Sequence, residues 1–269
     1  MNRDRWIRAA RGWEANADWF RKQTMPVAMW MVDAIAPQPG HRIVDLAAGI
    51  GDTGYLASEL IEPGGELITS DYQPEMLSAA QRRAQALGVR NVRFKQIDAS
   101  QPIDVEAASI DGVLCRWGYM LMDDGEAALR ETRRILRRDG RVALAAWCGP
   151  DENPWQSVPI RMLIERGALE PPEGGPGQFS WAEDGVIAEQ LENAGFVEYD
   201  VDRIDFPMRY ASLAEYWATL RSMGVTIGDA RVDDEEAFAR DLADAVAEWT
   251  AEDGSLAIPA ATWVAAGTG

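Results

Sequence analysis

The fold of this chain is decided by the stretch Arg42-Ile43-Val44-Asp45-Leu46-Ala47-Ala48-Gly49-Ile50-Gly51-Asp52-Thr53-Gly54. Its apolar run, residues 43–48, predicts a buried strand, and the glycines that follow predict a tight turn before a helix over residues 53–61. Glycine at 49 and 51 permits backbone conformations that other residues avoid, and it leaves no side chain between the backbone and a ligand. The stretch therefore predicts a strand, a turn and a helix, with a ligand held at the turn.

Two kinds of ligand use such a turn. Gly49, Gly51 and Gly54 satisfy G-x-G-x-x-G, and Asp71 follows Gly51 at about the twenty-residue distance expected of a ribose-binding acid, as in dinucleotide sites. Asp45, four residues before Gly49, favours a different ligand. A carboxylate at that position repels a pyrophosphate but attracts an ammonium group, such as the one that S-adenosylmethionine carries.

The segment Asp45–Gly51 resembles the first motif of the class I S-adenosylmethionine-dependent methyltransferases, D/E-x-G-x-G-x-G, with Ala47 in place of the first glycine. The resemblance covers roughly residues 40–150 and is closest to the ubiquinone and menaquinone C-methyltransferase type and related bacterial small-molecule enzymes. It continues in chain order through Ile68–Tyr72, Lys95–Ala99, Asp111–Cys115 and Leu136–Arg141.

The rest of the chain alternates between strands and helices. Strands are predicted at 42–47, 66–70, 92–97, 110–115 and 141–147, and helices at 53–61, 74–87 and 124–138. This alternation predicts a mostly parallel sheet that is covered on both faces. Two further strands, at 196–206 and 260–266, complete what the resemblance implies: an α/β, doubly wound, seven-stranded Rossmann-like sheet whose last strand is antiparallel.

Three regions are expected along the chain. Residues 1–40 form an N-terminal helical cap, with one apolar stripe running from Trp6 to Phe20 and a second helix beginning at Pro26. Residues 41–150 form the cofactor-binding core. Residues 151–269 complete the sheet and carry a helical substrate cap, about 207–258, before the last strand.

Roles are expected for single residues. The resemblance gives Asp71 the ribose hydroxyls. Arg116, after the fourth strand, is expected to bind the methionine carboxylate or a substrate anion, or to be a partly buried surface arginine, and Tyr119 is the catalytic candidate that could hydrogen-bond the nucleophile, or a core residue. Asp123 and Asp124 are further candidate bases, although this pair also marks the start of a helix. The cofactor-binding set is Asp45, Ala47, Gly49, Gly51, Asp71, Tyr72, Met76, Asp98, Ala99 and Arg116, and the substrate-binding set is Trp13, Phe20, Trp117, Tyr119 and Tyr216.

Composition narrows the class of substrate. The 269 residues include 26 basic and 44 acidic ones, a net charge of 26 − 44 = −18, which opposes binding to nucleic acid or to an anionic membrane. A small-molecule substrate is expected, and a homodimer is a further expectation. Cys115 and Cys148 fall in predicted core strands without disulfide or zinc spacing, and no apolar run has the length of a membrane span, so a cytoplasmic protein without a metal is predicted.

The predicted function is methyl transfer from S-adenosylmethionine to a small organic molecule, with carbon, oxygen and nitrogen acceptors all open. Such a displacement depends mainly on alignment and exclusion of water. One alternative is a non-catalytic S-adenosylmethionine-binding or interaction protein, which Ala47 and the lack of an obvious base support. A NAD-dependent oxidoreductase is disfavoured because neither Lys22 nor Lys95, the only lysines, follows a tyrosine by four residues.

Overall fold

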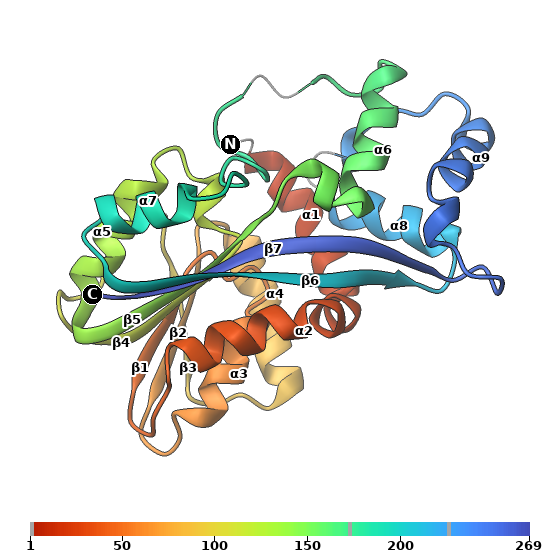
Figure 1. Ribbon diagram of the computed structural model, residues 1–269. Helices are drawn as coiled ribbons and strands as arrows, with labels where there is room; N and C mark the ends of the chain where they lie inside the picture. Colours follow the sequence, from red (N-terminus) through yellow and green to blue (C-terminus); the bar gives the residue numbers. More distant parts are fainter. Residues whose placement is uncertain (1–2, 172–173, 225–226) are drawn as a thin grey trace.

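The computed structural model describes residues 3–171, 174–224 and 227–269, and their centre is a sheet of seven strands (Figure 1). The strand order is β3-β2-β1-β4-β5-β7-β6. Strands β1 to β5 are mutually parallel, whereas β7 is antiparallel to both β5 and β6. The predicted fold class is confirmed. The strands are β1 Arg42–Asp45, β2 Glu66–Asp71, β3 Val92–Gln96, β4 Ile110–Arg116, β5 Leu136–Trp147, β6 Val197–Tyr210 and β7 Leu256–Thr268.

The strand order reverses at β1, which lies between β2 and β4. Asp45, the last residue of β1, pairs with Thr69 of β2 on one side and with Leu114 of β4 on the other. The loops that leave β1 and β4 therefore diverge to opposite faces of the sheet and open a crevice between them. In open α/β sheets this is where ligands bind.

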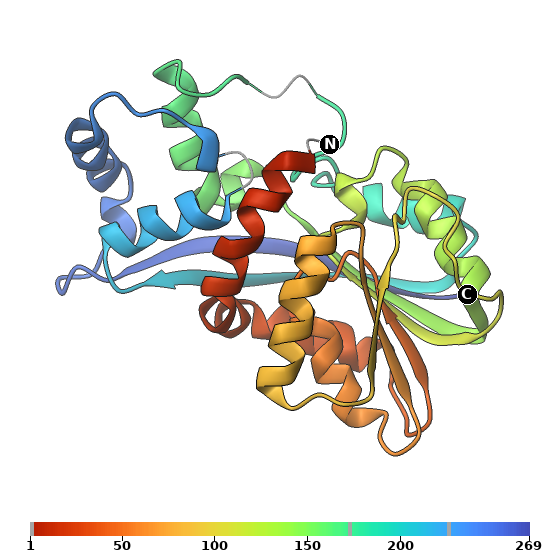
Figure 2. The same cartoon turned by 180° about the vertical axis from the view of Figure 1, so that it is seen from behind.

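Helices cover both faces of the sheet (Figures 1 and 2). Helices α2, α3 and α4 lie on one face, and α5 and α7 lie on the other. The helices are α1 Arg3–Ala15, α2 Ala17–Ala34, α3 Asp52–Leu60, α4 Pro74–Leu87, α5 Gly125–Ile135, α6 Pro154–Glu165, α7 Val186–Asn193, α8 Leu213–Met223 and α9 Glu235–Ala245, with short 3₁₀ turns at Tyr119–Leu121, Pro150–Glu152, Ile227–Asp229 and Ala247–Trp249. No helix of the described segments is long and apolar enough to cross a membrane.

The two N-terminal helices meet at Asn16, so the predicted break before Pro26 is wrong. Pro26 lies inside α2, whose buried residues pack on the sheet and offset the cost of one lost backbone donor. The chain turns at Asn16 because its side-chain amide donates to the carbonyl of Gly12 at 2.7 Å and to the Ser222 hydroxyl at 3.0 Å. The side chain of Trp6 lies outside the described part of the structure.

The insertion between β6 and β7 stands on an extension of these two strands. Their pairing continues from Phe206 opposite Ala260 to Tyr210 opposite Leu256, beyond the predicted strand ends. This antiparallel ribbon carries α8 and α9 above the carboxyl edge of the parallel strands (Figure 1). Helix α1 packs against both α8 and α4, so it bridges the insertion and the parallel part of the sheet.

Candidate functional site

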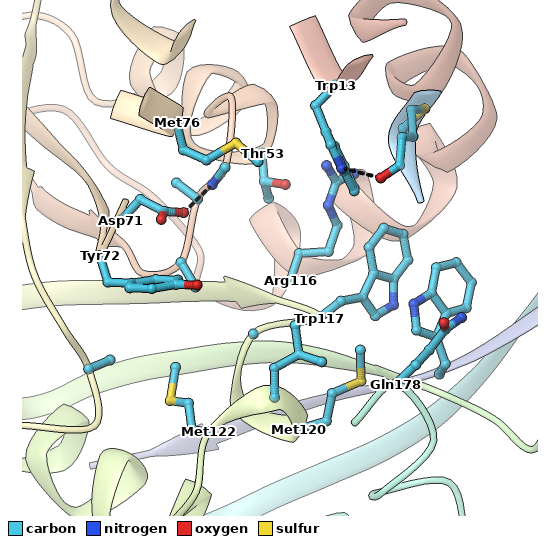
Figure 3. A pocket seen from close by; sticks show the side chains of 18 of the residues that line it. Trp13, Thr53, Asp71, Tyr72, Met76, Arg116, Trp117, Met120, Met122 and Gln178 are labelled. Carbon is cyan, nitrogen blue, oxygen red and sulfur yellow. Dashed lines mark hydrogen bonds between the residues drawn. The ribbon is translucent and has the colours of Figure 1, made fainter. Parts of the chain in front are cut away.

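A cavity of about 570 Å³ lies at the carboxyl ends of the parallel strands (Figure 3). Most of the residues that the sequence predicted for the site line this cavity, although they come from α1, α2, α4 and the ends of four strands. Those that line it are Trp13, Phe20, Asp45, Ala47, Gly49, Asp71, Tyr72, Met76, Asp98, Ala99, Arg116 and Trp117. Three predicted residues do not line it, and these are Gly51, Tyr119 and Tyr216.

The turn after β1 is left-handed at three positions. Ala47, Gly49 and Gly51 have φ values of +50°, +57° and +86°. A Cβ added to Gly49 would meet no atom within 4 Å, so the space beside this glycine is open to a ligand. A Cβ on Gly51 would lie 2.4 Å from the ring of Tyr55, so this glycine is needed for packing, and its contact with the cofactor stays a prediction. Ala47 keeps the left-handed turn at a cost of about 1 kcal/mol.

Asp71, at the end of β2, stabilises this turn by hydrogen bonds. Its Oδ2 accepts the backbone N–H of Gly49 at 3.0 Å (Figure 3), and its Oδ1 accepts that of Gln73 at 2.9 Å. Burial raises the pKa of Asp71 to about 6, while these hydrogen bonds act in the opposite direction. A carboxylate offers about four acceptor positions. Asp71 can therefore hold the turn and still accept a hydroxyl from a ligand.

Asp45 is a second buried acid on the cavity wall, with a 1% exposed side chain. Its Oδ2 accepts the N–H of Gly54 at 2.9 Å, and a Cβ on Gly54 would come within 2.8 Å of that oxygen. Burial raises the pKa of Asp45 to about 7, although the Gly54 hydrogen bond and the charge of Arg116 lower it. Among the described residues no donor reaches its other oxygen, Oδ1. A cation in the cavity would satisfy that oxygen and favour the ionised form.

Arg116, at the end of β4, brings a positive charge to the same wall. Its Nη1 donates to the Thr24 hydroxyl at 2.7 Å, and its guanidinium lies 5.4 Å from the ring centre of Phe20 and 4.9 Å from that of Trp117. Burial lowers the pKa of Arg116 to about 10, so it stays charged at neutral pH. In Figure 3 its guanidinium and the side chain of Thr53, in the first turn of α3, extend toward the same part of the cavity. Together with the helix N-terminus they form an environment for an anion.

Aromatic rings form the other half of the cavity. Trp117 has a left-handed backbone, φ +59°, and its ring stacks on Trp147 with centroids 4.1 Å apart and planes at 9°. Its indole N–H donates to the Thr262 hydroxyl at 2.9 Å, which helps to hold the unusual backbone. Phe20 continues the wall at 5.8 Å from Trp117, and Trp13 lies 4.8 Å from Phe20. Trp13 itself donates to the carbonyl of Met223, which joins α1 to α8 (Figure 3).

Sequence reasoning missed several residues of this half. They come from α2, from the end of β5, from α6, from α8 and from the loop before α7, where no motif marks them. An apolar strand ending in tryptophan was the only signal available for Trp147. The missed residues are Trp19, Trp147, Trp155, Gln156, Gln178 and Thr219.

Two predicted tyrosines lie in the core instead of the cavity. The hydroxyl of Tyr119 is 2.6 Å from the Thr132 hydroxyl, its ring stacks on Trp181, and its side chain is 1% exposed. Burial holds the pKa of Tyr119 well above its ordinary value. The Tyr216 hydroxyl donates to the carbonyl of Trp155 at 2.7 Å, and the side chain is fully buried. Neither hydroxyl can reach a ligand, so the catalytic role of Tyr119 and the substrate-binding roles of both are corrected.

The acid pair after Tyr119 divides in the structure. Asp124 accepts the N–H of Ala127 at 2.7 Å and caps α5, as its position before the helix predicted. Asp123 lines the cavity and is exposed. Of the candidate bases that the sequence offered, only Asp123 is therefore in contact with the cavity.

Comparison with known proteins identifies the domain. The methyltransferase domain family matches residues 37–163, which contain β1 to β5 and the turn at Gly49. Residues 37–163 are a methyltransferase domain. The nocamycin O-methyltransferase of Saccharothrix syringae is 28% identical over 70% of this chain and 70% of that protein. A demethylmenaquinone methyltransferase of Thermus thermophilus is 34% identical over 50% of this chain and 60% of that protein.

Solved structures share the fold of this methyltransferase domain and of the strands that follow it. The crystal structure of the YcgJ protein from Bacillus subtilis has a TM-score of 0.59 at 22% identity and covers 90% of this chain and 97% of that one. A geranyl diphosphate methyltransferase solved in complex with S-adenosylmethionine has a TM-score of 0.52 at 18% identity, with 91% and 85% covered. This chain is thus homologous to bacterial S-adenosylmethionine-dependent small-molecule methyltransferases. It spans 43% to 70% of the length of the curated relatives that it matches.

Proposed function

We propose that this protein transfers a methyl group from S-adenosylmethionine to a small organic molecule. The observation that carries the proposal is the order of groups along the carboxyl edge of the sheet. Asp71, Asp45 and Arg116 end the neighbouring strands β2, β1 and β4, and they face one cavity. In the proposed cofactor the ribose lies at one end of this row and the amino-acid group, whose ammonium and carboxylate share one carbon, lies at the other.

Strand spacing sets the length of this row of groups. Neighbouring strands lie about 4.8 Å apart, so the step from β3 to β4 across β2 and β1 spans roughly 14 Å. Asp98 and Tyr72 flank the adenine end, with Ala99 and Met76 beside them. Asp71 lies next, to accept the ribose hydroxyls. The open space at Gly49 admits the chain of the ligand close to the backbone.

The two charged residues nearest the centre complete the cradle. The free Oδ1 of Asp45 would accept the ammonium group, and its pKa of about 7 would fall when that charge is bound. Arg116 and Thr53 would hold the carboxylate at the start of α3. These residues fit S-adenosylmethionine better than NAD, since Asp45 would repel a pyrophosphate at this turn.

The bound cofactor supplies a methyl group on an already activated carbon. The residues of this chain then supply alignment and a dry environment. Phe20 and Trp117 cover the boundary between the charged half and the aromatic half of the cavity, and α8 of the inserted cap closes the aromatic half through Thr219 and Leu220. Holding an acceptor in line and excluding water is the main source of rate that such a site can provide.

Isothermal titration calorimetry with S-adenosylhomocysteine tests the proposal, with NAD titrated under the same conditions. We expect micromolar affinity for S-adenosylhomocysteine and no heat from NAD. Asp71→Asn should weaken the former by about 30-fold, or roughly 2 kcal/mol, because a charged acceptor of the ribose is lost. Asp123→Asn, which changes an exposed acid of the same cavity, is the matched control and should bind normally. Binding of NAD alone, or equal affinities for the two variants, would refute the assignment.

A further inference from the structure

We propose that the methyl acceptor is a flat, uncharged aromatic molecule that carries a ring hydroxyl or carbonyl group. This inference rests on the proposed function and concerns the half of the cavity that the cofactor leaves free. We name this half the acceptor chamber and define it by Trp19, Phe20, Trp117, Trp147, Trp155, Gln156, Gln178 and Thr219.

The walls of the acceptor chamber favour a flat molecule. Trp147 stacks on Trp117, and Trp155 leans against Trp147 at 5.4 Å with a tilt of 55°. Trp19 and Phe20 continue the wall, with centroids 6.2 Å apart, and Phe20 meets Trp117 at 5.8 Å. These rings belong to α2, to the ends of β4 and β5, and to α6, so they enclose one space from several sides. Large rigid rings held in this way bind planar apolar surface at little cost in side-chain entropy.

The polar side chains of the acceptor chamber are uncharged. The Gln178 amide donates to the carbonyl oxygen of the Gln156 side chain, which leaves the Gln156 amide N–H groups and the Gln178 carbonyl oxygen available. The indole N–H of Trp147 has no acceptor among the described residues. Thr219 adds a hydroxyl from α8. Neutral hydrogen-bonding groups at the rim of an apolar space recognise hydroxyl or carbonyl groups of a ligand. A ligand without such groups would leave these protein groups unpaired when it binds.

Charge on the acceptor would be unfavourable here. The acids of the cavity lining lie on the cofactor half, and Asp123 follows Met122, which Figure 3 places toward the Tyr72 end. A carboxylate or diphosphate would enter an apolar space whose nearest cation, Arg116, is assigned to the cofactor. The described residues contain no cluster of three His, Cys, Asp or Glu side chains that could hold a metal ion for a diphosphate. A cationic acceptor would meet the Arg116 guanidinium on the faces of Phe20 and Trp117. A neutral acceptor avoids both costs.

The acceptor chamber also restricts how acidic the acceptor must be. None of the residues that define it carries a carboxylate, imidazole or amine that could serve as a base, so an acceptor with an acidic proton of its own is favoured. A phenolic hydroxyl meets this requirement, whereas an aliphatic alcohol does not. The aromatic walls and the uncharged polar groups of the acceptor chamber therefore point to hydroxylated rings.

Binding measurements on the full chain test this inference without depending on turnover. We would titrate 2-naphthol, 2-naphthoate and 1-decanol into the protein by calorimetry at pH 7.5, with and without saturating S-adenosylhomocysteine. 2-Naphthol should bind at least tenfold more tightly than the other two. Gln178→Leu should weaken 2-naphthol about three- to tenfold, as expected for one lost hydrogen bond. Gln101→Leu, which changes an amide of the same cavity beyond the adenine end, should leave it unchanged. Gln156→Leu serves as a second variant should Gln178→Leu fail to fold.

The outcomes separate the two proposals. If S-adenosylhomocysteine binds and 2-naphthoate or 1-decanol binds as tightly as 2-naphthol, the acceptor class is wrong and the cofactor assignment stands. Equal effects of Gln178→Leu and Gln101→Leu would also overturn the acceptor class. If S-adenosylhomocysteine does not bind, the proposed function fails. The titrations without it would still decide whether the acceptor chamber prefers neutral aromatic molecules.

Discussion

Asp45→Asn should remove a pH dependence from the stability of the ligand-free protein. The Asp45 carboxyl is 1% exposed, and its pKa is about 7 in the folded protein against an ordinary value of 3.8. Between these two values the folded protein holds a proton that the unfolded chain has lost. Stability therefore falls as the pH rises through this window, and the burial cost of the carboxylate is fully present above pH 7.

The size of the effect follows from the width of the window. From pH 5 to the folded pKa of about 7 there are two pH units, and each is worth 1.36 kcal/mol, so the carboxyl should cost about 3 kcal/mol of stability between pH 5 and pH 8. Asparagine keeps an oxygen for the Gly54 N–H but carries no charge. Asp45→Asn should therefore gain about 3 kcal/mol relative to the wild-type protein over that range, and it should be the more stable protein at pH 8.

Urea unfolding followed by tryptophan fluorescence at pH 5, 6, 7 and 8 measures this difference. Asp71, with a pKa of about 6, titrates in both proteins, so its contribution largely cancels from the comparison. Asp98→Asn is the matched control because Asp98 is an exposed acid at the same cavity, and its profile should follow that of the wild-type protein. Parallel pH profiles for wild-type and Asp45→Asn would show that Asp45 is ionised in the folded protein at pH 5, which refutes the reasoning.

Three further substitutions test the framework of the site. Arg83→Ala should lower the free energy of unfolding by about 3 kcal/mol, since it removes a partner of the buried carboxylate at the start of α3. Arg82→Ala, at an exposed ion pair, should cost much less, and equal losses in urea unfolding would contradict this. Ala47→Gly should be neutral or stabilising by up to about 1 kcal/mol because it relieves a left-handed backbone, whereas Ala48→Gly, without a positive φ, should destabilise by a similar amount in the same assay. Tyr119→Phe should leave the affinity for S-adenosylhomocysteine unchanged in calorimetry. A tenfold loss of affinity would show that the Tyr119 hydroxyl contacts the ligand.

The sequence by itself determined the sheet and the cofactor half of the cavity. Each of these features is local in the chain: an apolar run, the glycine turn that follows it, and an acid at the strand end. Asp45, Gly49 and Asp71 could be placed because parallel strands bring their carboxyl ends to one edge whatever the packing elsewhere. The alternation of strands and helices predicted that both faces are covered, because the helices that connect parallel strands pack on the faces of the sheet.

The tertiary structure decided the acceptor chamber and the direction of the side chains beside it. Trp147, Trp155 and Gln178 meet only because β5, α6 and the loop before α7 converge, and no spacing along the chain records that convergence. The left-handed backbone of Trp117 turns the chain so that Trp117 faces the cavity while Tyr119, two residues later, faces the Thr132 hydroxyl in the core. The sequence pattern predicts only that Trp117 and Tyr119 follow the fourth strand. Which of them reaches the ligand depends on the packing around that single turn.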